Sequence, residues 1–457
     1  MANSGESGGA GDLRRDPLLV SVCIAVVTMP MEISGLWFPS TLVNVSRLAM
    51  LAAMIVVGLR LVRRVPVVLP AARWLPLVVG VVLAVDVASA LAFGWPGAAR
   101  EVVSAAYQGA FAICLVAALT DRRRIVVVAL CVVAAGFAEA ALILAQQAGD
   151  FYLTQVRDMA GRRNGTFVDP NIAARFLLVA LCVALVGAGR AAGGRLRLLA
   201  PTAAVMTAAI VLTYSRTAWL LLVVLVLAGL VAGWRDRRIG VVAATILVVF
   251  GVSLLAVPHA LDRARDLPAA QDPTAAAGTT LVAWMPNPPT PAPGTADATP
   301  ASPIDRVIDV LPLDPVRRYL AKAGVAMFLD HPVIGVGLGG YAPQLQGRYA
   351  AYIDPEYHYR QIVLPHTDLI RIAAEEGLVG LFAFALLVLA VVLAIRRAWI
   401  GATPFGRSTV VAASLAVGIV FLTSQTEGRL LPDPYLWTAL GVIAALPASR
   451  RSARAGL

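Results

Sequence analysis

Two arginines stand beside a glycine turn in the stretch RRNGTFVDPN, which covers residues 162–171. Arg162 and Arg163 could bind an anion, because a guanidinium donates paired hydrogen bonds to phosphate oxygens and stays charged at any physiological pH. Asn171 follows an Asp-Pro pair that is typical of a helix start. The alternative is a pair of interfacial arginines next to an ordinary helix cap. This stretch alone leaves both interpretations open.

Arg216 lies in the turn TYSRTAW, which separates two apolar stretches. The turn is too short to be a solvated loop. An arginine held there is costly unless it pairs with a partner or faces a polar cavity. Arg216 could therefore bind an anion, or it could anchor the chain at the headgroup level beside Trp219.

A histidine and a glutamate occur in the stretch PHTDLIRIAAEEG, which runs into another apolar segment. His366 could act as a general base, donate a hydrogen bond to phosphate, or simply neighbour a helix cap formed by Thr367 or Asp368. Glu375 follows Arg371 by four residues, so an ion pair on one helix face accounts for both. Taken alone, this segment is explained by structure as well as by function.

The sequence motifs of nucleotide and metal chemistry do not occur. The chain contains no P-loop, no GxSxG, no HExxH and no acidic DxD pair. Its four cysteines stand singly in apolar segments, which predicts neither a disulfide nor a metal site. We therefore expect a protein that uses no cofactor.

Helices that cross a membrane must position these residues. Of the 457 residues, 59% are hydrophobic and only 14% are charged, which is too little charge for the surface of a soluble protein. The apolar stretches are long enough to cross a hydrocarbon core of roughly 30 Å. We predict an all-α polytopic membrane protein. The expected spans are 17–30, 42–61, 74–94, 101–120, 125–149, 170–189, 197–214, 217–234, 239–258, 378–395, 408–425 and 431–447.

The arginines between the spans predict the orientation. Seven clusters fall on one side of the predicted membrane, which the positive-inside rule assigns to the cytoplasm together with both termini. The net charge of +11 follows from these clusters, so it does not indicate a nucleic-acid partner. The segments 150–169, 213–219 and 259–365 carry arginine on the opposite side, where the rule does not explain it. An anionic ligand at the outer face is the natural explanation.

Several ionisable residues lie within the predicted spans, and we expect four of them in the outer half of the membrane. Such residues usually face a polar cavity or one another. An outward-opening cavity would explain them, and so would interhelical pairs such as Glu139 with Arg175. The four are Arg47, Asp86, Glu139 and Arg175.

The chain is expected to divide into three parts. Residues 1–258 hold nine spans and the outer loop 150–169. Residues 259–365 form an extracytoplasmic loop with a Pro/Ala/Thr-rich insertion at 267–303. After the insertion, an amphipathic helix should begin near Asp314, stop at Pro332 and lead into the stretch GVGLGGY. Residues 366–457 complete the chain with three spans and a basic cytoplasmic tail.

Four segments, in order, resemble the motifs of the O-antigen ligase/polymerase superfamily of bacterial membrane glycosyltransferases. RRNGTFVDPN is similar to R-x-x-G-T-F-x-N-P-N, which gives Arg162 and Asn171. LTYSRTAW is similar to L-x-x-S-R-x-A, which gives Arg216. RRYLAKAGVAMFLDHPVIGVGLGGY is similar to an arginine-bearing helix followed by DHP-x-x-G-x-G-x-G, which gives Arg317. HTDLIRIAAEEGLVGL is similar to H-N-D-x-L…E-x-G-x-x-G, which gives His366 and Glu375.

Three positions depart from the family pattern. Asp169 replaces an asparagine, Ala321 a tryptophan and Thr367 an asparagine. None of these changes removes a charged residue, so they bear on acceptor or packing detail more than on the class of protein.

The resemblance implies a GT-C-like membrane glycosyltransferase of about twelve spans in the bacterial inner membrane. Such an enzyme moves a glycan from undecaprenyl diphosphate to a hydroxyl of a glycan, lipid or protein acceptor at the outer face, in O-antigen, capsule or exopolysaccharide synthesis. His366, Arg216 and Arg162 would be catalytic. Substrate binding would involve Arg163, Asn171, Arg317 and Glu375.

Several alternatives remain open at this point. The sequence does not separate a ligase from a polymerase or a protein O-glycosyltransferase. A transporter or flippase of an anionic lipid-linked substrate would also suit twelve spans with intramembrane charges, although transporters usually bind substrate near the midplane between matching halves. A scaffold for other envelope enzymes would tolerate loss of the arginines.

Overall fold

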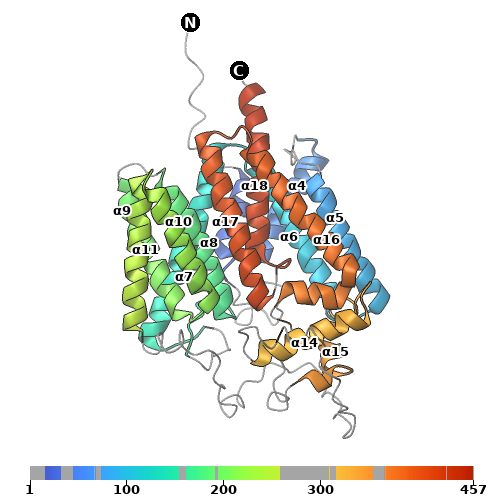
Figure 1. Cartoon of the computed structure of the whole chain (residues 1–457). Coiled ribbons are helices and arrows are strands. Elements are labelled where there is room, and N and C mark those ends of the chain that lie inside the picture. Colours follow the sequence, from blue (N-terminus) through green and yellow to red (C-terminus); the bar gives the residue numbers. More distant parts are fainter. Residues whose placement is uncertain are drawn as a thin grey trace.

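The computed structural model describes residues 16–31, 45–65, 67, 74–153, 161–190, 194–257, 308, 315–353, 365, 367–428 and 430–455. Within these ranges the regular structure is entirely helical. Long helices form a bundle, and two shorter helices lie across one of its ends (Figure 1). The predicted insertion at 267–303 lies outside the described residues.

Every predicted span overlaps a helix of the bundle. Among the described residues, nine helices are long and apolar enough to cross a membrane, and three more apolar helices are shorter. The described part of the chain is thus all-helical and consistent with a multi-pass membrane protein, and the count of twelve spans stays a prediction. The helices are α2 (Pro17–Thr28), α4 (Val45–Val62), α5 (Trp74–Phe93), α6 (Ala98–Ala118), α7 (Arg122–Gly149), α8 (Pro170–Ala188), α9 (Gly194–Leu212), α10 (Arg216–Gly233), α11 (Arg237–Ala256), α16 (Asp368–Trp399), α17 (Pro404–Glu427) and α18 (Pro434–Ala455).

The bundle has two flanks joined by a central pair of helices. Figure 1 shows α9, α10 and α11 together on one flank, α4, α5 and α16 on the other, and α17 and α18 between them. Large apolar side chains such as Leu91 and Leu255 are about four-fifths exposed, at 81% and 77%. Exposed apolar surface of this kind suits contact with lipid chains rather than with water.

Several of the predicted cytoplasmic arginine clusters meet at one end of the bundle, which we call the basic end. Asp16, just before α2, accepts hydrogen bonds of 2.6 Å from both Arg60 of α4 and Arg124 of α7. Arg190, just after α8, donates a hydrogen bond of 3.1 Å to Ser408 of α17. The alternating connections inferred from charge are therefore compatible with the folded chain.

The opposite end, which we call the motif end, carries the loop 161–169 and the helices α14 (Pro315–Asp330) and α15 (Tyr341–Gln346). The prediction of a helix that stops at Pro332 is confirmed by α14. Tyr341 is buried in a small separate core against α14, where its hydroxyl donates a hydrogen bond of 2.5 Å to the Leu320 carbonyl.

α16 is interrupted at Gly377, whose φ of 62° and ψ of −150° lie outside the helical region. The amide groups of Leu378 and Val379 instead donate to the carbonyls of Pro332 and Val333, at 2.8 and 3.1 Å. Non-helical backbone inside a membrane bundle persists only where its polar groups find such partners. The DHP segment after α14 therefore docks into the kink of α16.

The glycine-rich stretch after the DHP segment completes the other half of this junction. Val336 and Gly337 donate backbone hydrogen bonds, each of 2.8 Å, to the carbonyls of Ala374 and Glu375 in α16. Gly335 has a φ of +67°, and a Cβ atom there would overlap the backbone of Glu375. Two of the motifs noted in the sequence thus form a single hydrogen-bonded unit.

Candidate functional site

The loop 161–169 is held on α7 by two buried polar side chains. Glu139 accepts hydrogen bonds from the backbone amide and the hydroxyl of Thr166, at 2.7 and 2.9 Å. Gln146 both donates to the Gly165 carbonyl, at 2.9 Å, and accepts from the Gly165 amide, at 2.8 Å. Glu139, which lies within a predicted span, therefore has a structural role, because it keeps the first motif in place.

Arg162 connects the first motif to the second. Its Nε donates a hydrogen bond of 2.7 Å to the carbonyl of Thr213, and its other guanidinium nitrogen donates to the side-chain oxygen of Asn171. The amide of Arg163 donates to the Leu212 carbonyl at 3.1 Å. Two segments about 50 residues apart are thus joined next to the arginines that the sequence singled out.

The side chain of Arg163 points toward the end of α7. It donates to Gln147, at 2.9 Å, and forms an ion pair of 2.8 Å with Asp150. Its guanidinium also lies 5.0 Å from the centre of the Tyr152 ring. These contacts give Arg163 a role in holding the loop, and its predicted role in substrate binding stays a prediction.

Arg216 is the first residue of α10, and its side chain is exposed. Tyr214, two residues earlier, has a φ of 52°, in the left-handed region that non-glycine residues seldom occupy. Trp219 is buried against the Ile210 carbonyl, to which its indole donates at 3.3 Å. Trp219 therefore packs inside the bundle, so it does not support the alternative of an interfacial anchor.

The last turn of α17 meets two of the motifs. The hydroxyl of Thr217, in the first turn of α10, donates a hydrogen bond of 3.3 Å to the hydroxyl of Thr426. The hydroxyl of Thr367, just before α16, donates one of 3.0 Å to the carbonyl of Gln425. Consecutive residues of α17 therefore bring the starts of α10 and α16 together.

His366 itself lies outside the described residues. Its neighbour Thr367 contacts the same turn of α17 as Thr217, which is the neighbour of Arg216. The second and the fourth motif thus approach each other at the motif end, which is the geometric relation that the sequence could only suggest.

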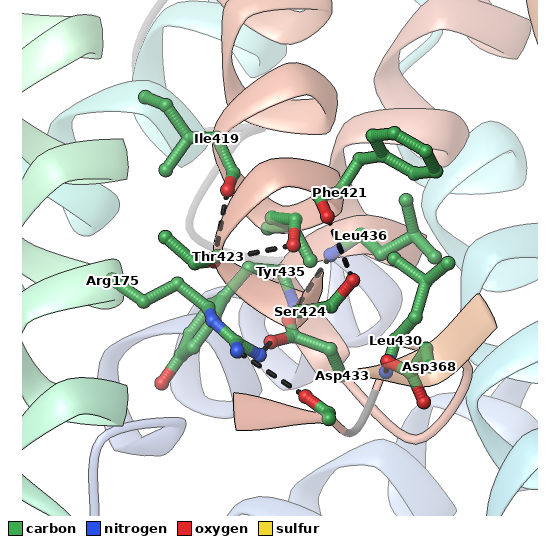
Figure 2. Close-up of polar contacts among 12 residues, drawn as sticks. Arg175, Asp368, Ile419, Phe421, Thr423, Ser424, Leu430, Asp433, Tyr435 and Leu436 are labelled. Atoms are coloured by element: carbon green, nitrogen blue, oxygen red, sulfur yellow. Dashed lines mark hydrogen bonds and ion pairs between the residues drawn. The ribbon is translucent and has the colours of Figure 1, made fainter. Parts of the chain in front are cut away.

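The connection between α17 and α18 is fixed by buried charges (Figure 2). Arg175 of α8 forms an ion pair of 2.7 Å with Asp433, and the exposed fractions of the two side chains are 1% and 3%. Arg175 also donates to the Gly428 carbonyl at 3.3 Å, and Asp368 accepts from the Leu430 amide at 2.7 Å. The interhelical pairing expected for Arg175 is thus present, with Asp433 rather than Glu139 as the carboxylate.

Glu375 lies among charges at the start of α16. It is 3.7 Å from Arg371, which confirms the predicted ion pair, and it accepts a hydrogen bond of 3.1 Å from the Tyr341 amide. Arg371 also pairs with Asp368, at 3.2 Å, and with Glu101 of α6. These contacts anchor α15 on α16, and the predicted binding role of Glu375 stays a prediction.

Arg317 is in the first turn of α14 and is partly buried. α14 is tied to the rest of the motif end through Tyr341, whose hydroxyl and amide reach Leu320 and Glu375. The helix that carries Arg317 is therefore connected to the motif of His366.

The sequence motifs do not include the segment 425–433, whose residues Gln425 and Leu430 contact the start of α16 in the structure. A usable signal was present, because Asp433 precedes Pro434 as Asp169 precedes Pro170 in the first motif. The intramembrane Arg175 also needed a carboxylate at its own depth. Only the packing of α8 against α17 shows where that carboxylate comes from.

These features define a multi-pass membrane protein with arginine motifs gathered at one end of a helical bundle. Residues 201–385 match the model of the O-antigen ligase family. The match runs from α9 through the kink of α16, so it includes the turn of Arg216, α14, the glycine-rich stretch and residues 366–375. This match supports membership of the chain in the O-antigen ligase superfamily. No curated protein matches it.

Proposed function

We propose that the protein transfers a glycan from undecaprenyl diphosphate to an acceptor hydroxyl at the extracytoplasmic face of the inner membrane. Family membership supports a glycosyltransferase-type activity on a lipid-linked glycan. The observation that carries the proposal is the convergence at α17, where Thr217 and Thr367 contact neighbouring residues. The arginine of the second motif and the histidine of the fourth would then face one substrate.

The proposed role of the arginines is to hold the diphosphate. When the bond between the sugar and the diphosphate breaks, negative charge grows on the leaving phosphate oxygen. Arg216, with Arg162 and Arg317, would stabilise that charge by donating hydrogen bonds to the phosphate oxygens from positions that are fixed before the reaction. Arg216 is the best placed of the three because its side chain is exposed at the start of α10.

His366 is proposed as the general base. The acceptor hydroxyl attacks the anomeric carbon, the new glycosidic bond forms as the diphosphate leaves, and the hydroxyl proton passes to the imidazole. The bonds of Thr367 and Asp368 to α17 and to the segment after it would keep the base oriented.

Purified protein supplied with a lipid-diphosphate glycan and an acceptor tests this proposal. We expect His366→Ala to lower the transfer rate by about 10²–10⁴-fold and Arg216→Ala by about 10²–10³-fold. Arg348→Ala is the matched control, since Arg348 is an exposed arginine at the motif end that pairs with Asp330 at 3.2 Å. Full activity in correctly inserted His366→Ala and Arg216→Ala proteins would contradict the mechanism.

The glycan-length profile of cells that lack the gene separates the remaining activities. Long glycans that disappear on deletion of the gene indicate a polymerase, whereas lipid-linked polymer that accumulates indicates a ligase. Movement of the lipid-linked glycan across vesicles without a new glycosidic bond would indicate the transporter or flippase instead.

A further inference from the structure

The helical bundle contains a cavity of about 480 Å³, lined by residues of α2, α7, α8, α9, α17 and α18. Apolar side chains form most of its wall, among them Val179, Val183 and Ala412. Arg122 and Arg190, together with Ser408, line the part of the cavity that lies at the basic end. The arginines proposed to hold the donor do not line this cavity, so it is a separate feature.

The size and the lining of the cavity indicate a hydrocarbon occupant. Protein interiors contain few voids larger than a water molecule, and an apolar cavity does not hold water stably. At its other end, Phe176 and Tyr435 line the cavity, with ring centres 4.9 Å apart. A membrane supplies flexible hydrocarbon chains that suit such a space.

The two arginines at the basic end supply charge complementarity to an anion. The guanidinium of Arg122 lies 4.7 Å from the centre of the Phe405 ring. Arg190 donates hydrogen bonds to the hydroxyl of Ser408, at 3.1 Å, and to the carbonyl of Pro404. These partners are all neutral, and both arginine residues are exposed. Within the described part of the chain, no carboxylate forms an ion pair with Arg122 or Arg190.

We propose that this cavity binds an anionic phospholipid. One acyl chain fills the apolar interior between α7, α8 and α17, and the headgroup phosphate lies between Arg122 and Arg190. Basic pockets between membrane helices bind anionic headgroups by this combination of charge and apolar contact. The bound lipid would join α8 to the central helix α17, because both helices line the cavity.

Native mass spectrometry of the purified full-length protein tests the proposal, with phosphatidylglycerol and phosphatidylcholine as probes. We expect the wild type to retain phosphatidylglycerol in preference to phosphatidylcholine. Each of Arg122→Gln and Arg190→Gln should weaken phosphatidylglycerol binding about fivefold. Ala412→Phe should reduce the binding of both lipids because the ring occupies the space of the chain.

Arg407→Gln is the matched control. Arg407 is an exposed arginine in the first turn of α17, at the basic end. Its guanidinium lies 5.7 Å from the centre of the Trp399 ring, and it does not line the cavity. The proposal is overturned if Arg407→Gln weakens binding as much as Arg122→Gln, or if the wild type holds phosphatidylcholine equally well. Competition between the two lipids on the wild type decides the matter even if a variant fails to fold.

Discussion

At the scale of the residue, the buried charges of the bundle hold backbone segments in place. Arg175 is almost entirely buried, and its ion pair with Asp433 fixes the connection that also receives Asp368. A buried pair is not necessarily more stable than apolar residues of the same size, but removal of one partner leaves an uncompensated charge. The pair therefore matters most for keeping the segment after α17 in one position.

Replacement of Arg175 by methionine should destabilise the protein by about 3–5 kcal/mol, because Asp433 is left charged and without its guanidinium partner. The double variant Arg175→Met with Asp433→Leu should recover much of the loss. Thermal unfolding of the purified protein measures both. The exposed pair Arg348–Asp330 is the control, and Arg348→Met should cost at most about 1 kcal/mol. Equal shifts for Arg175→Met and Arg348→Met would contradict this account.

Asp16 predicts an acid-sensitive contribution at the basic end. Burial acts to raise the pKa of its carboxyl, but the adjacent Arg124 and Arg60 outweigh burial and hold the pKa below the usual 3.8. The stabilisation is therefore complete above the unfolded pKa and is lost as the pH falls through the lower folded pKa. Asp16→Asn should flatten the fall in unfolding temperature below about pH 4. An unchanged acid profile would show that Asp16 does not contribute.

At the scale of the element, the kink of α16 explains why glycine occurs where it does in two motifs. Gly377 exposes two amides and two carbonyls of the helix, and the segment 332–337 satisfies all four. The part of α16 before Gly377 starts next to His366, and the part after Gly377 forms the span. The segment that follows α14 is hydrogen-bonded to α16 at the break between these two parts. The local sequence predicts a helix around Gly377, whereas the break in that helix depends on its hydrogen bonds with the segment 332–337.

Gly377→Ala should destabilise this junction, since alanine disfavours the positive φ by roughly 1–2 kcal/mol and its Cβ would overlap the Val333 backbone at 2.6 Å. We expect a lower unfolding temperature and slower glycan transfer. Gly251→Ala in α11 is the control, because no atom lies within 4 Å of the added Cβ and the change favours a helix. A Gly377→Ala protein as stable as Gly251→Ala would count against the role of the kink.

At the scale of the whole molecule, the two ends of the bundle have different chemistry. Arginines at the basic end meet Asp16, neutral acceptors or aromatic rings, whereas the motif end gathers the loop 161–169, α14 and α15. The positive-inside rule assigns the basic end to the cytoplasm. The proposed chemistry would then take place on the outer side, where a lipid-diphosphate glycan is available to an acceptor.

Single cysteines test that orientation in a variant whose four native cysteines are replaced by alanine. A membrane-impermeant maleimide should label Arg348→Cys in intact spheroplasts. Arg407→Cys, an exposed position at the basic end, should be labelled only after the membrane is permeabilised. Labelling in the reverse order would invert the predicted topology, and with it the side on which transfer occurs.

The sequence by itself determined the positions of the apolar helices, the helix before the DHP segment, the arginine clusters and the four motifs that resemble the family. These features depend on the length of apolar stretches, on local helix signals and on charges near span ends, all of which act over a few tens of residues. Only the tertiary structure decided which partners the charges take. Arg175 and Asp433 are 258 residues apart, and Glu139 contacts a loop rather than Arg175. The convergence on α17 and the lipid-sized cavity likewise arise from helix packing, because partner choice depends on which helix faces meet and not on any local pattern.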